Sequence, residues 1–244
     1  MKKSVFASLL IIFLLIPATL FLGTQLTGRM YYLTSTLMII EMMLPFFLAF
    51  ETRKPQAREL VTLAVLCALA VAARVVIPIP NFRPITAVVM LAGIALGPEA
   101  GFMTGAVSAF ASNFFFSQGP WTPWQMMAYG IGGFVAGIVF FRARKHPAWK
   151  MAVFGFFAIL LLVGPLLDLC TAFTTASVVS WQYVIAVLTM GIAMNLQHAA
   201  TCAVTLLLLG PPLLKKIGRL KTKYGMIEQM GSFQKERDAH YEKI

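Results

Sequence analysis

Apolar stretches separated by short polar or Gly/Pro-rich segments make up most of the chain. About 20 mostly apolar residues are needed to cross the roughly 30 Å hydrocarbon core of a bilayer, and shorter helices occur inside bundles. Seven stretches of about this length and one shorter stretch cover about residues 5–23, 31–50, 59–77, 84–96, 99–116, 124–141, 149–176 and 181–209. The pattern predicts an all-α integral membrane protein with about eight spans.

Proline and glycine mark several boundaries of these stretches. Pro78-Ile79-Pro80-Asn81 closes the third, and Gly97-Pro98 separates the fourth from the fifth. Gly164-Pro165 inside the seventh predicts a kink, because proline removes a backbone donor from a helix. Gly210-Pro211-Pro212 predicts the end of the last span, and a polar tail follows it.

The beginning of the chain allows two interpretations. Lys2 and Lys3 followed by an apolar stretch are typical of a secretory signal peptide. Phe21 and Gly23 make a poor small-x-small cleavage site, so we favour an uncleaved first helix.

Charged residues are scarce and unevenly distributed. Hydrophobic residues make up 59% of the chain and charged residues 12%, against about 25% charged in soluble domains, which excludes a soluble enzyme and a disordered chain. The net charge of +11 would suit nucleic-acid binding. With the N-terminus inside, however, 17 Lys and Arg residues fall on the cytoplasmic side and only Arg29, Arg74 and Arg83 outside. This positive-inside pattern predicts a multi-pass plasma-membrane protein with both termini cytoplasmic and no nucleic-acid partner.

Residue types that carry enzyme chemistry form no recognisable motif. Cys67, Cys170 and Cys202 lie in separate apolar stretches without a C-x-x-C pair, which favours small buried residues over disulfides or zinc ligands. The chain has no Walker A, H-E-x-x-H or G-x-S-x-G motif. We therefore expect no catalytic residue, no metal and no cofactor, and a transporter built on this chain would need an energising partner or an ion gradient.

Polar residues within the spans are candidates for a binding site. An intramembrane charge costs about 2.5–3.5 kcal/mol, so it normally faces a cavity or a partner. Asp168 is the clearest case; Asn113, Asn195 and His198 lie near it in topology, the last two on one helical face. These side chains either line a substrate cavity or hydrogen-bond between helices to hold the bundle together. Glu41 lies apart from them and would pair with a neighbouring helix or another subunit.

Aromatic residues are concentrated at the predicted outer face, between the fifth and sixth stretches. Residues 114–125 contain five aromatic side chains, including Trp121 and Trp124, together with Gly, Pro and Gln118. Tryptophan at an interface is commonly a membrane anchor. The rigid Gly/Pro backbone alternatively suits a lid over an external binding pocket.

The segment between the third and fourth stretches is expected beside this lid. It carries Asn81 and Arg83. Both are candidates to contact a ligand, although Arg83 is also compatible with a residue that snorkels to the headgroups.

Small residues recur at every fourth position in the third stretch. Ala64, Ala68 and Ala72 would form one smooth stripe on a helix. Such a stripe lets another helix approach closely. The partner helix would belong either to another protein or to the same bundle.

Residues 58–214 resemble the substrate-binding S component of an energy-coupling factor (ECF) vitamin transporter. The resemblance consists of a six-helix core with the alanine stripe on its first helix, a short second helix leading to Leu96-Gly97-Pro98-Glu99-Ala100-Gly101-Phe102, and a Gly/Ala-rich third helix. Its most specific part runs from Phe82 to Met126, above all Ser112-Asn113-Phe-Phe-Phe-Ser-Gln-Gly-Pro-Trp-Thr-Pro-Trp124. Residues 1–57, with two extra N-terminal transmembrane helices, and the basic cytoplasmic tail 215–244 depart from the six-helix pattern.

The resemblance implies a non-catalytic subunit that captures a vitamin at its outer face, docks on a transmembrane coupling protein driven by two cytoplasmic ATPases, and releases the ligand inside. Ala64 and Ala68, extended by Ala72, would be the docking stripe, and the loop 78–83 would help to gate the pocket. The ligand candidates are Asn81, Arg83, Asn113, Gln118, Trp121, Trp124, Asp168, Asn195 and His198. Within the family, the aromatic loop and the added spans look most like the cobalamin-type group, although a riboflavin-like heterocycle would also stack on tryptophan.

Three other classes stay open at this point. An ion-coupled secondary transporter of a small organic solute would use Glu41 and Asp168, work without ATPases and lose uptake on Asp168→Asn. A membrane enzyme would need paired acid and base residues, and only the separated Asp168 and His198 are available. A scaffold would use its spans to recruit other subunits.

Overall fold

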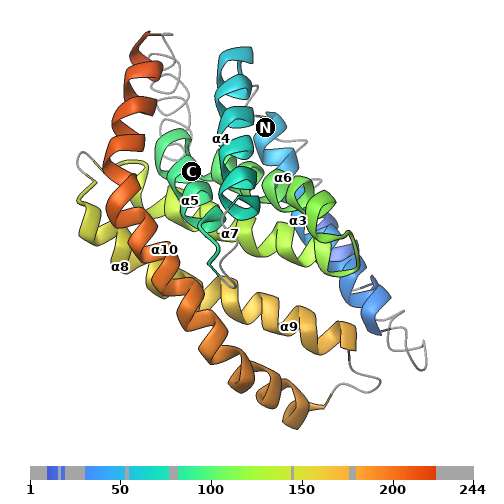
Figure 1. The fold of residues 1–244 in the computed structure, drawn as a ribbon. Helices are drawn as coiled ribbons and strands as arrows, with labels where there is room; N and C mark the ends of the chain where they lie inside the picture. Colours follow the sequence, from blue (N-terminus) through green and yellow to red (C-terminus); the bar gives the residue numbers. More distant parts are fainter. Residues whose placement is uncertain are drawn as a thin grey trace.

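A computed structural model of the chain describes residues 10–15, 18–19, 31–52, 55–76, 82–143, 146–175 and 180–223. Helices connected by short segments form all of the regular structure in these ranges. Their order is η1 (Ile11–Leu15), α3 (Tyr31–Thr52), α4 (Ala57–Val75), α5 (Ile85–Leu96), α6 (Pro98–Phe116), α7 (Trp121–Phe140), α8 (Ala148–Ala158), η2 (Ile159–Val163), α9 (Gly164–Thr175) and α10 (Trp181–Lys223). In Figure 1, α9 and the first half of α10 extend away from the bundle that contains α4 to α7.

The fold is that of an all-α membrane protein, as the sequence predicts. In the described ranges, three helical segments are long and apolar enough to cross a membrane, and they are Leu33–Thr52, Ala148–Thr175 and Trp181–Lys223. The count of eight spans, the cytoplasmic position of both termini and the division into 1–57, 58–214 and 215–244 stay predictions.

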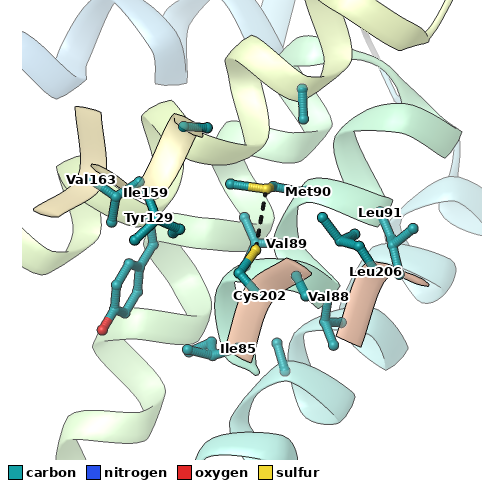
Figure 2. Packing of buried hydrophobic residues seen from close by; sticks show 14 of the residues in the cluster. Ile85, Val88, Val89, Met90, Leu91, Tyr129, Ile159, Val163, Cys202 and Leu206 are labelled. Carbon is teal, nitrogen blue, oxygen red and sulfur yellow. Dashed lines mark hydrogen bonds between the residues drawn. The ribbon is translucent and has the colours of Figure 1, made fainter. Parts of the chain in front are cut away.

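The short helix α5 lies at the centre of the bundle. All of its residues are buried, and it contacts α4, α6, α7 and α10. A helix that is apolar on every side is stable only when other helices surround it. Figure 2 shows residues of α5 packed among side chains of α7, η2 and α10; the labelled ones are Ile85, Val88, Val89, Met90, Leu91, Tyr129, Ile159, Val163, Cys202 and Leu206.

Glycines allow α5, α6 and α7 to approach each other closely. A Cβ atom placed on Gly93 or on Gly101 would collide with the backbone of Gly133. The three helices therefore pack backbone against backbone at this point, an approach that small residues permit in membrane bundles.

The seventh apolar stretch forms one interrupted helix. The π-helical turn η2 lies directly before Gly164 and Pro165 and separates α8 from α9. Pro165 cannot donate to a carbonyl in the preceding turn, and π-helical turns are a common way to accommodate such a break. The predicted interruption at this site is confirmed.

The predicted end of the last span at Gly210-Pro211-Pro212 is wrong. α10 continues through both prolines to Lys223. Beyond them, Ile217 is buried in a cluster with residues of α3, α4 and α5, and the Lys221 ammonium donates a hydrogen bond to the carbonyl of Ala95 near the end of α5. Two prolines remove only two backbone donors, and these tertiary contacts stabilise the helix on their far side.

The N-terminal helix α3 packs on α6, α7 and α9. Phe46 stacks on Phe102 with ring centroids 4.1 Å apart and meets Phe134 edge to face at 5.0 Å. Glu41 is buried, and its carboxylate accepts a hydrogen bond of 2.6 Å from the hydroxyl of Thr19. The partner of Glu41 in the described structure thus comes from the preceding segment of the same chain.

Candidate functional site

A chain of polar contacts joins three helices at the ends where α4 and α6 finish and α7 begins. Arg74, in the last turn of α4, donates from its guanidinium to the hydroxyl of Ser112 and, at 3.0 Å, to Oδ1 of Asn113. Asn113 donates in turn to the hydroxyl of Thr122 on α7, also at 3.0 Å. Asn113 was predicted as a ligand residue, whereas Arg74 had entered the sequence argument only as a charge on the outer side.

The connection from α6 to α7 is shorter than predicted. The predicted aromatic loop is largely helical, because Phe114 to Phe116 form the end of α6 and Trp121 begins α7. Gln118 accepts a hydrogen bond from Thr122 at 2.9 Å and donates to the carbonyl of Phe110 at 3.0 Å. Gln118 therefore closes this turn with both of its polar atoms.

The two predicted tryptophans differ in their surroundings. Trp121 is 39% exposed and donates to the carbonyl of Ser117 at 3.3 Å. Trp124 is 5% exposed and stacks on Phe173 of α9 with centroids 5.9 Å apart. Its indole Nε1 is buried and has no hydrogen-bond partner among the described residues.

One face of α7 carries two further buried polar atoms without partners in the described ranges. They are Oε1 of Gln125 and the hydroxyl of Tyr129. Residues four apart lie on one side of a helix, and Thr122 lies one turn earlier on the same side. Buried polar atoms are nearly always hydrogen-bonded, so these atoms mark a place where a further polar group fits. Neither residue was selected from the sequence, although their spacing of four could have indicated them.

His198 of α10 faces this side of α7. It is 4% exposed, its Nε2 shares a hydrogen bond of 3.1 Å with the hydroxyl of Thr86, and its ring lies 6.4 Å from that of Tyr129 in an edge-to-face arrangement. The Tyr129 hydroxyl points away from the apolar cluster in Figure 2. Arg83, directly before α5, and Arg74 both lie within electrostatic range of His198. The structure thus brings the predicted Arg83, Asn113 and His198 to one region.

Asp168 and Asn195 form a contact between α9 and α10. The amide of Asn195 donates to the Asp168 carboxylate at 2.6 Å. Gly164 and Gly191 leave the space that these two side chains occupy, because a Cβ on either glycine would collide with them. The pair therefore fulfils the bundle-holding role that the sequence left as one alternative. Asn81 lies outside the described residues, as does most of the loop 78–83.

The alanine stripe lies on an open face of α4. Ala64, Ala68 and Ala72 are all exposed. An apolar groove of about 470 Å³ runs beside Ala68 and Ala72 and is completed by α6 residues Ala111 and Phe115. The stripe is therefore available to a partner and is not used for packing among the described helices.

Comparison with known proteins gives one match. Residues 54–217 match the family model described as "ECF-type riboflavin transporter, S component". Searches of curated proteins and of solved structures returned no match.

Proposed function

Because the chain belongs to the S-component family of ECF transporters, we propose that it binds a vitamin where α4 ends and α7 begins, and passes it to the cytoplasm with partner subunits. An S component is a substrate-binding transport subunit that works with ECF partners. The coupling protein and two ATPases would supply the driving force, because this chain has no nucleotide-binding motif of its own.

One observation carries the proposed site. Three buried polar atoms, on Trp124, Gln125 and Tyr129, lack hydrogen-bond partners within the described ranges. An unpartnered buried polar group costs about 1–3 kcal/mol. A ligand that supplies complementary polar groups would recover this free energy, and the stacked Trp124 and Phe173 rings offer an apolar surface beside them.

The ligand we place here is a riboflavin-type vitamin. The description of the matching family names riboflavin, and a flat heterocycle has both the polar edge and the apolar faces that these side chains complement. The cobalamin-type prediction receives no support from the comparisons. A vitamin panel that contains both compounds decides between them.

The site is tested on the chain purified alone in detergent. Mass spectrometry would identify a retained vitamin, and quenching of tryptophan fluorescence would then measure the Kd for each member of the panel. Tyr129→Phe removes a hydroxyl that has no partner in the described structure, so we expect unchanged thermal stability and ligand binding weakened about tenfold. Tyr183→Phe, at an exposed hydroxyl bonded to Thr175, is the matched control. A chain that ignores the whole panel would refute the function, and equal binding by both variants would refute the site.

The docking surface that we propose is the stripe Ala64, Ala68 and Ala72. Ala68→Trp fills the open groove beside it, so we expect loss of co-purification with the coupling protein and ATPases while vitamin affinity is retained. Ala200→Trp places the same side chain on an exposed position of α10 and should leave the complex intact. Survival of the complex with Ala68→Trp would remove the stripe from the interface. Uptake by cells without the ATPases would instead favour the ion-coupled transporter.

A further inference from the structure

Two arginines approach each other beside the proposed vitamin site. Arg74 ends α4 and Arg83 precedes α5, and each lies within electrostatic range of the other and of His198. Both side chains are partly buried. Positive charges held together within a membrane protein are costly unless a negative group faces them.

The described residues supply no such negative group. Arg74 contacts the neutral side chains of Ser112 and Asn113 and lies 4.8 Å from the ring of Phe116. No hydrogen bond or ion pair involves the Arg83 side chain in the ranges that the structure describes. The two positive charges are therefore uncompensated by the described part of the chain.

The acidic side chains closest in topology have other partners. Asp168 accepts the hydrogen bond from Asn195, and Glu41 accepts the one from Thr19. Neither forms an ion pair with an arginine among the described contacts.

The neighbouring groups are mainly hydrogen-bond donors. The hydroxyl of Tyr129 is buried without a partner in the described structure and lies within electrostatic range of Arg74. An arginine guanidinium offers a planar fork of N–H donors, which matches a carboxylate or a phosphate better than it matches a neutral carbonyl. Two guanidinium groups and a phenol hydroxyl next to each other suit a ligand oxygen that carries negative charge.

We propose that the ligand bound here carries an anionic group, a carboxylate or a phosphate, and that Arg83 determines this specificity together with Arg74. The inference rests on the proposed function, because it concerns the chemical class of the same ligand. Arg74 also holds α4 to α6 through its hydrogen bonds. Arg83 makes no such contact among the described residues, so it has donors available for the ligand.

Pairs of compounds that differ only in the anionic group test this proposal. We would titrate the purified full chain with riboflavin and riboflavin 5′-phosphate, and with panthenol and pantothenate. In the pair that binds, we expect the anionic member to bind at least tenfold more tightly. The pair in which this preference occurs distinguishes a phosphate from a carboxylate.

Variants of Arg83 then identify the group responsible. Arg83→Gln should bring the two affinities of the pair to within about twofold and leave the affinity of the neutral member unchanged. Arg83→Lys keeps the charge and should retain part of the preference. Arg219→Gln removes an exposed arginine of α10 and should change neither affinity. Thermal unfolding of each variant identifies any that are misfolded.

The outcomes separate this inference from the function on which it rests. If riboflavin or another neutral vitamin binds tightly and its anionic counterpart binds no better, the inference is wrong and the function stands. The same holds if the preference survives Arg83→Gln in a folded protein. If no member of the vitamin panel binds, the proposed function and the inference fail together.

Discussion

The close packing of α5, α6 and α7 leads to a quantitative prediction for Gly101→Ala. The added Cβ would lie 2.5 Å from the carbonyl oxygen of Gly133 and 2.7 Å from the Cα of Gly93. Ordinary contact begins at 3.4 Å, so α6 has to move by about 0.9 Å against two other backbones. No flexible side chain is among the closest atoms to absorb this movement.

The expected cost follows from two opposing effects. Overpacking of a well-packed core costs about 1–3 kcal/mol, while replacing glycine by alanine inside a helix gains about 0.5–1 kcal/mol. We expect a net loss of about 1–2 kcal/mol, or a Tm lower by about 2–8 °C for a chain of this size.

Thermal unfolding of the detergent-purified protein would measure this difference. Gly218→Ala is the matched control, because Gly218 lies in α10 and a Cβ there meets nothing within 4 Å. This control should keep or raise the Tm. Equal shifts for the two variants would refute the reasoning, since helix propensity alone would then account for both.

Two further predictions concern polar groups outside the ligand site. Thr19→Val removes the hydroxyl that bonds to the buried Glu41 carboxylate and should cost about 1–3 kcal/mol of stability; Thr52→Val, at an exposed hydroxyl, should cost little, and equal Tm values for the two would contradict the account. Burial, with a smaller effect from Lys221, lowers the pKa of His146. The unfolded chain then binds more protons than the folded one as the pH falls below about 6.5, so acid should destabilise the protein, and His146→Gln should reduce this slope in Tm measured against pH. An unchanged slope would mean that His146 contributes nothing to it.

The helices themselves could be predicted largely from the sequence, because hydrophobic length and Gly/Pro punctuation are local properties. α3, α5 and α6 follow the predicted stretches closely, and the break before Gly164 was expected from Pro165. The end of α10 could not be predicted from Gly210-Pro211-Pro212, because contacts of Ile217 and Lys221 with distant helices stabilise the helix beyond the prolines. Local breakers lose when tertiary contacts on their far side outweigh them.

The candidate site was only partly predictable for the same reason. Asn113 and His198 stood out as polar residues in apolar surroundings, and the structure brings them to one region with Arg83. Gln125 and Tyr129 carry ordinary side chains for the start of a membrane helix, and only their burial without partners among the described residues distinguishes them.

For this protein, the sequence by itself determined the environment and the helices, because a bilayer selects for long apolar segments and sparse, one-sided charge. It also led to the S-component resemblance through the residues from Phe82 to Met126. The tertiary structure alone decided the partners of each polar group: Asp168 bonds to Asn195, while Arg74 and Arg83 approach each other. These pairings join residues far apart in the chain, and their geometry depends on how closely the glycine-lined helices pack.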